Sequence, residues 1–142
     1  MKPAWAILLV ALLPAATDAK ARSKGLPRYG TFTYSNLCWR NDTTDVVGAR
    51  LMLSRTRKGA HLDFEYGNGP LQSSRIRSLN VVGDRIEAEA STAKGELGLA
   101  AVLGPRTAKI SMLFDDQKDG QPEVGVLKRI KSFKQKIPTC RG

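Results

Sequence analysis

His61 is the only histidine of this 142-residue chain and the residue best suited to acid–base or metal chemistry. It alternates with the carboxylates Asp63 and Glu65, and alternate residues of a β-strand point to one face. A His-x-Asp pair on one face can chelate a metal ion. Residues two apart on a strand are separated by about 6.6 Å, however, so the three side chains cannot easily reach one ion. Because no second histidine completes a ligand set, we interpret the trio as a solvated outer face and predict no metal site.

A second pattern, Asp115-x-Gln117-x-Asp119-Gly120, is similar to the start of a calcium-binding loop. The glycine stands at the sixth position, as such loops require. The twelfth position is Val126, however, where these loops place a bidentate glutamate. We therefore interpret the segment as a polar hairpin loop in which Gly120 takes a positive φ.

Signatures of catalysis and nucleotide binding are missing from the sequence. It contains no Gly-x-Ser-x-Gly elbow for a nucleophilic serine, no Walker loop and no Gly-x-Gly-x-x-Gly turn. Glu87 and Glu89 alternate with alanines, which is typical of surface charges rather than of a catalytic pair. We predict a non-enzymatic protein without a cofactor, and an enzyme that uses His61 is the third hypothesis, behind two binding functions.

The basic residues are the strongest functional signal. The formal net charge is +10 at pH 7, and no acidic residue follows Glu123. A charge of this sign attracts nucleic acid, anionic lipid head groups or acidic polysaccharide. We therefore expect an anionic polymer or an anionic lipid surface as the partner; the alternative is a merely solvated basic end. The N-terminal basic group comprises Arg22, Lys24 and Arg28, and the predicted binding residues are Lys128, Arg129, Lys131, Lys134, Lys136 and Arg141.

Cys38 and Cys140 are the only cysteines, and an isolated pair in an oxidising compartment most simply forms one disulfide. Such a bond brings two Cα atoms to within about 7 Å of each other. It therefore predicts that the first and last elements of the fold are neighbours. We also expect it to bring the two basic groups to one region of the surface.

Residues 1–19 have the three parts of a secretory signal peptide: a basic start, an apolar run from Ala4 to Leu13, and small residues before the exit. Cleavage after Ala19 or after Ala21 fits equally well. The apolar run is too short to span a bilayer, which needs about 20 residues. We therefore predict an exported protein, periplasmic or secreted, with no transmembrane segment after removal of the leader.

The rest of the chain is organised as one domain. We predict that residues 20–28 form a basic arm and that residues 29–142 form a single β-barrel domain with a basic C-terminal tail. Apolar and polar residues alternate with period two between Gly-containing turns, which indicates antiparallel strands. We expect about eight strands, at residues 29–34, 47–54, 61–66, 75–82, 85–90, 97–101, 108–114 and 124–126.

Consecutive hairpins form a meander, and an eight-strand meander closes into an up-and-down barrel, which removes exposed sheet edges. We therefore predict an all-β fold, an antiparallel meander closed into a small barrel; a β-sandwich is the alternative. A barrel of this size can hold one small ligand, so a carrier of a small apolar ligand is the second functional hypothesis. The barrel interior would be lined by residues such as Leu51, Phe64, Ile86, Leu99 and Ile110.

The C-terminal tail permits two interpretations. Val126, Ile130, Phe133 and Ile137 are spaced as one stripe of a helix. The same residues could continue the last strand through Ile130 and then form a polar arm attached at Cys140. We favour the strand and arm, because the segment begins as a strand and no N-cap precedes the stripe.

Overall fold

The computed structural model describes residues 25–117 and 120–141. The predicted leader, residues 1–19, and the basic residues Arg22 and Lys24 lie outside the described residues. Within the two described ranges the chain forms no helix, and hence none long and apolar enough to cross a membrane. The strands are β1 (Gly30–Ser35), β2 (Cys38–Trp39), β3 (Val46–Thr56), β4 (Gly59–Gly69), β5 (Leu71–Ser73), β6 (Arg75–Val82), β7 (Arg85–Thr92), β8 (Gly95–Leu103), β9 (Thr107–Phe114) and β10 (Glu123–Ile130).

The eight longer strands occupy the segments that the alternation of apolar and polar residues predicts. In β7, for example, Ile86, Ala88 and Ala90 are buried and the residues between them are exposed, because successive side chains of a strand point to opposite faces. The alternation does not predict β2 and β5, because strands of two and three residues are too short to show it.

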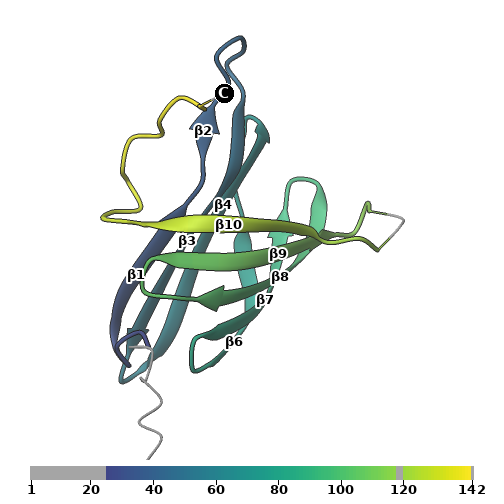
Figure 1. The fold of residues 1–142 in the computed structure, drawn as a ribbon. Coiled ribbons are helices and arrows are strands. Elements are labelled where there is room, and N and C mark those ends of the chain that lie inside the picture. The colour runs from purple at the N-terminus through teal and green to yellow at the C-terminus, as the bar shows by residue number, and fades with distance from the viewer. Residues whose placement is uncertain (1–24, 118–119, 142) are drawn as a thin grey trace, which may run out of the picture.

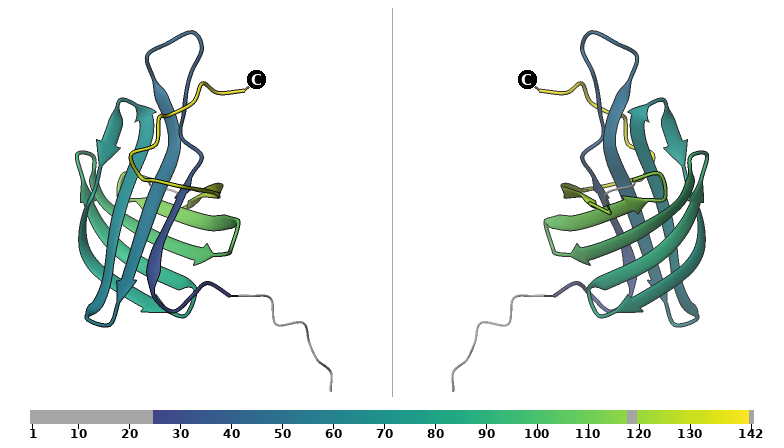
Figure 2. Two further views of the ribbon diagram at one scale, coloured as in Figure 1. Left: turned by 90° about the vertical axis from the view of Figure 1, so that its left-hand side faces the viewer. Right: turned by 90° about the vertical axis from the view of Figure 1, so that its right-hand side faces the viewer.

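The strands form one antiparallel sheet in the order β5-β4-β3-β1-β10-β9-β8-β7-β6, with β2 paired to β3. The sheet curls until β1 meets β10, where Thr33 lies opposite Ile130 and Ser35 opposite Lys128 (Figure 1). Figure 2 shows the resulting barrel from two sides. A seam remains between β4 and β6, which no ladder joins in the described chain. The predicted all-β antiparallel barrel is therefore confirmed, with one unsealed seam in place of full closure.

The interior of the barrel is filled by side chains. Ile76, Leu79 and Val81 of β6 pack against the core, so apolar side chains join β6 to the rest of the barrel. Ser74 strengthens this joint, because its N–H and its hydroxyl both donate to Phe64 O, at 3.1 and 2.9 Å. The five residues predicted to line a ligand cavity are at most 3% exposed and belong to one core cluster: Leu51, Phe64, Ile86, Leu99 and Ile110. Most of the interior is therefore packed core.

Arginine and aromatic side chains close one end of the barrel, where β3 ends and β7 begins. Arg55 donates from Nη1 to Gly83 O and from Nη2 to Pro27 O, both at 2.7 Å. The guanidinium groups of Arg55 and Arg129 lie over the Phe32 ring, 5.0 and 5.1 Å from its centre. These contacts join the segment before β1 to the β6–β7 turn and to β1, β3 and β10, and we call this region the closed end.

Tyr34 lies at the closed end and is fully buried. Its hydroxyl donates to Gly104 O at 2.7 Å, so the buried polar group has a partner. Burial raises the pKa of Tyr34, and the nearby positive charge of Arg129 opposes this effect in part. The neutral phenol is therefore the form that the fold favours.

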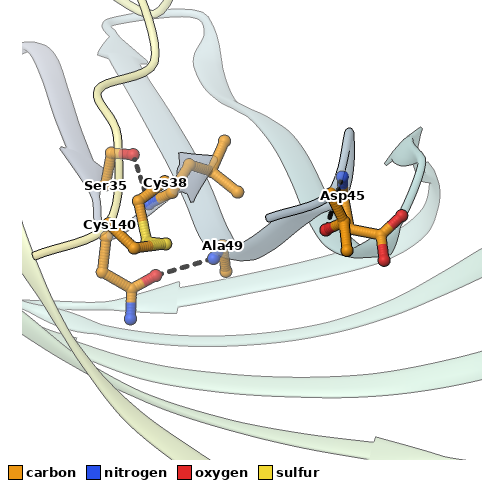
Figure 3. The surroundings of a disulfide bond; sticks show 8 residues. Ser35, Cys38, Asp45, Ala49 and Cys140 are labelled. Carbon is orange, nitrogen blue, oxygen red and sulfur yellow. Dashed lines mark hydrogen bonds between the residues drawn. A yellow bond between two sulfur atoms is a disulfide. The ribbon is translucent and has the colours of Figure 1, made fainter. Parts of the chain in front are cut away.

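The tail, residues 131–141, leaves β10 and returns along the outside of the barrel to β2 (Figure 1). There Trp39 N–H donates to Pro138 O at 2.8 Å, and Cys140 N–H donates to Trp39 O at 2.7 Å. Cys38 and Cys140 form a disulfide with their Cα atoms 4.8 Å apart (Figure 3). The predicted disulfide and the predicted strand and arm are confirmed, and the helical interpretation of the tail is wrong.

Candidate functional site

The tail is also held in its middle by Arg50, which projects from the outer face of β3. Arg50 Nε and Nη2 donate to Glu65 Oε2 at 3.0 and 2.7 Å, and its Nη1 donates to Gln135 O of the tail at 3.0 Å. The guanidinium also lies 4.9 Å from the centre of the Phe133 ring. Although Arg50 points outward, only 8% of its side chain is exposed. Arg50 and the disulfide therefore fix the tail to the barrel at two points.

A groove of about 500 Å³ runs between the outer face of β10 and the tail. Lys128 lines it from β10, and Lys136 and Arg141 line it from the tail. Val126 and Ile137 add apolar surface. We call this hollow, with these five residues along it, the tail groove. None of the described residues that line it is acidic. Its basic lining also includes Arg129 and Arg50, and Glu65 compensates the charge of Arg50.

Two further predicted binding residues lie beside the tail groove rather than in it. Lys131 and Lys134 are exposed on the turn that follows β10. With Thr31 and Thr33 of β1 they line a neighbouring open hollow, which also has no acidic residue among its described lining. The positive surface therefore continues from the tail groove around the end of β10.

Arg129 is among the lining residues of both hollows, but its guanidinium lies over aromatic rings at the closed end. Arg129 follows Lys128 on a strand, and consecutive strand residues face opposite sides. Its guanidinium lies 5.5 Å from the centre of the Tyr34 ring, at the closed end. Arg28 stacks on Tyr29 at the opposite end of β1 from the disulfide, and it lines neither hollow. The disulfide therefore does not bring Arg28 into the tail groove, contrary to the expectation from sequence.

The open end of the barrel holds a second hollow, of about 340 Å³, which we call the mouth cleft. Its apolar surface comes from Tyr66 of β4 and from Ile110, Met112 and Phe114 of β9. Of the five interior residues predicted to line a cavity, Ile110 alone reaches it. The polar residues around it are Asn36, Asn68, Lys94, Asp116, Gln117 and Glu123.

The two hollows are distinct, and among their described lining residues they share only Asn36. No family model, curated protein or solved structure matches this chain. The ligands of the hollows are therefore inferred from the residues that line them. The tail groove is cationic, whereas the mouth cleft has Lys94 opposed by Asp116 and Glu123.

His61 and Asp63 lie on the outer face of β4, with 71% and 41% of their side chains exposed and with Nε2 and Oδ1 3.2 Å apart. Glu65 pairs with Arg50 instead of joining them. In the described ranges no group of three His, Cys, Asp or Glu residues could hold a metal ion. Gly120 has a φ of 61°, as predicted for the polar loop, while Asp119 lies outside the described residues.

Proposed function

We propose that this protein is an exported, non-enzymatic β-barrel module that binds an anionic partner, a polymer or a lipid surface, along the tail groove. The observation that supports this is the convergence of three cations on one groove, Lys128 from β10 and Lys136 and Arg141 from the tail. The described residues of the groove include no carboxylate that would neutralise these charges. Phosphate, sulfate or carboxylate groups of a partner would therefore meet all three cations together.

The two attachments of the tail favour binding because they reduce the conformational entropy that the tail loses when a partner binds. Lysine and arginine side chains on an unattached tail would lose conformational entropy when a partner orders them. Here the disulfide holds the tail beyond Lys136, and Arg50 holds it at Gln135. Because Glu65 compensates its charge, Arg50 positions the groove rather than binding the partner.

The proposal includes a location outside the cytoplasm. A disulfide such as this one fits an oxidising compartment. The sequence of residues 1–19, which lie outside the described residues, has the features of an export signal. We therefore infer a periplasmic or secreted protein.

A salt titration tests the proposed binding, with heparin, a short DNA duplex and anionic vesicles as probes. The triple variant Lys128→Gln, Lys136→Gln, Arg141→Gln removes three of the positive charges that line the groove and leaves the disulfide in place. We expect its affinity for the retained probe to fall about 10-fold or more at low salt. For DNA, the slope of log affinity against log salt should also become shallower by about 2 to 3, because about one counterion is released for each neutralised phosphate.

The matched control removes the same charge elsewhere, through Arg57→Gln, Lys58→Gln and Arg85→Gln. These three residues are exposed in the β3–β4 turn and at the start of β7. We expect the control to bind within about threefold of the wild type, because distant surface charges are screened. Equal losses in the two triple variants would mean that net charge alone attracts the partner. That result, or no retention on any probe at low salt, would overturn the proposal.

A further inference from the structure

Gly125 stands on the inward face of β10 in a position where nothing in the backbone requires glycine. By contrast, Gly48 has a φ of 103°, and a Cβ on Gly67 would come within 2.6 Å of Val46 O. The φ of Gly125 lies outside the left-handed range, and a Cβ there would make only ordinary contacts, at 3.7 Å. Glycine inside a strand destabilises it and often marks a place that a ligand approaches closely. The missing side chain leaves space in the mouth cleft, which Gly125 lines.

The apolar surface of the mouth cleft suits a flat or compact hydrocarbon body. The rings of Tyr66 and Phe114 lie 5.3 Å apart and are tilted by 58° to each other. Tyr66 donates its hydroxyl to Gln72 Oε1 at 2.9 Å and is only 4% exposed, so the partly buried Phe114 presents the more accessible ring to a ligand. Met112 and Ile110 complete this surface. A volume of about 340 Å³ is near the lower end of the range for small-molecule sites, which fits a small ligand.

Asn36 gives the mouth cleft a directed hydrogen-bond donor. Its Oδ1 accepts from Ala49 N–H at 2.7 Å, which fixes the orientation of the amide. Its Nδ2 is then a donor, and it lies 3.7 Å from the Cβ position of Gly125. The amide of Gln117 is already occupied, because it accepts from the backbone of β9 at 3.3 Å and donates to Glu123 Oε1 at 3.2 Å. A ligand that approaches Gly125 therefore meets the Asn36 donor.

We propose that the mouth cleft binds a small uncharged molecule with an aromatic or aliphatic body and a carbonyl group. The carbonyl oxygen accepts from Asn36 Nδ2, and the body packs on the aromatic surface beside Gly125. Charges of both signs surround the cleft, Lys94 against Asp116 and Glu123, so a strongly charged ligand gains little there. This site shares only Asn36 with the lining of the tail groove, and its failure would leave the proposed function untouched.

A fluorescent probe of the proposed chemistry is 6-propionyl-2-(dimethylamino)naphthalene, an uncharged naphthalene with one carbonyl. Its emission shifts to the blue in apolar surroundings. We expect saturable, blue-shifted emission with one probe bound per protein. Because the site is not cationic, the affinity should change little with salt, and heparin should not displace the probe.

Gly125→Leu fills the mouth cleft, and Gly98→Leu is its matched control. Gly98 is also a strand glycine with open surroundings, its nearest atom to an added Cβ being Leu113 O at 3.8 Å, but it faces outward from β8. We expect Gly125→Leu to weaken probe binding about 10-fold or more, through steric exclusion. Gly98→Leu should bind within about twofold of the wild type, because it leaves the cleft unchanged.

Asn36→Asp tests the donor separately from the space. The aspartate keeps an oxygen that can accept from Ala49 N–H, but it replaces the Nδ2 donor by a second acceptor. We expect probe binding to weaken about 3- to 10-fold, the value of one hydrogen bond. Circular dichroism verifies that each variant is folded. If Gly125→Leu does not fold, Gly125→Ala replaces it, with an expected loss of about 2- to 5-fold.

Three outcomes overturn the proposal. One is the absence of saturable probe binding to the wild type. Another is a folded Gly125→Leu variant that binds as tightly as the wild type. The last is an equal loss in Gly125→Leu and Gly98→Leu, which would place the probe on the outer surface of the sheet.

Discussion

The tail groove and the mouth cleft belong to the same barrel but are built by different means. One wall of the groove is β10 and the other is the tail, so the groove depends on the disulfide and on Arg50 to exist at all. The cleft is formed by strands and their turns, and it depends on the absence of a side chain at Gly125. The first hollow is held by distant attachments and the second by local packing, so a substitution can remove one and leave the other.

Removal of the disulfide should have the largest effect of the variants considered, and it should weaken binding at the tail groove while leaving binding at the mouth cleft unchanged. In the double variant Cys38→Ser, Cys140→Ser the cross-link over a sequence separation of 102 residues is lost. The unfolding free energy should fall by about 3–5 kcal/mol in a denaturant titration, because the unfolded chain is no longer constrained. Groove affinity should fall about 10-fold, because Lys136 and Arg141 are no longer held near Lys128. Probe affinity at the cleft should stay within about twofold, and a parallel loss there would contradict the separation.

Arg50→Ala should also lower the unfolding free energy, but by less than removal of the disulfide. It leaves Glu65, which is 17% exposed, without its cation, and it removes the donor to Gln135 O. We expect a loss of about 3 kcal/mol in unfolding free energy, since an unpaired, largely buried carboxylate remains. The double variant Arg50→Ala, Glu65→Ala should be more stable than the sum of the two single losses predicts. Strict additivity would mean that the pair contributes nothing beyond its separate side chains.

Tyr34→Phe changes a residue at the closed end, away from both hollows, and should have the smallest effect on the unfolding free energy. Loss of the hydrogen bond to Gly104 O should cost about 1 kcal/mol at pH 7. Burial raises the pKa of Tyr34, so the folded state keeps this proton at a pH where the unfolded chain loses it. The stabilisation is therefore complete below about pH 10 and is lost as the pH rises toward the folded pKa. Unfolding titrations of both proteins should show a difference that is constant below about pH 9 and shrinks above about pH 10; a growing difference would contradict this.

The strands and the disulfide could be predicted because they depend on local patterns and on composition. Period-two alternation is strong in segments such as the one around Leu51 or Ile86, whose buried faces need no knowledge of the neighbouring strand. Two cysteines allow only one internal pairing. The positive tail groove was predictable in part, because the absence of acidic residues after Glu123 does not depend on the fold.

The rest depends on register and on which strands meet, and alternation does not determine either. Arg50 and Glu65 both have outward positions by pattern, yet they are direct partners across β3 and β4 and are covered by the tail. Arg129 is the residue after Lys128 on β10, so its side chain points to the opposite face of the sheet. The seam cannot be predicted from alternation either: Ser74 N–H donates to Phe64 O, yet within the described residues no ladder joins β4 to β6. The role of Gly125 follows only from the empty space around it.

The unsealed seam marks a point at which a backbone cut would break no β-ladder. It lies in the middle of the sequence, at Ser74, whereas the ladder that closes the sheet joins β1 and β10 near the two ends. A single backbone cut at Ser74 would yield two fragments, β1–β5 and β6–β10, with one cysteine each. The disulfide would keep the nicked fragments covalently joined, and the β1–β10 ladder and the shared core would form their interface. A protein cut at Ser74 is therefore expected to remain one covalently linked barrel until the disulfide is reduced.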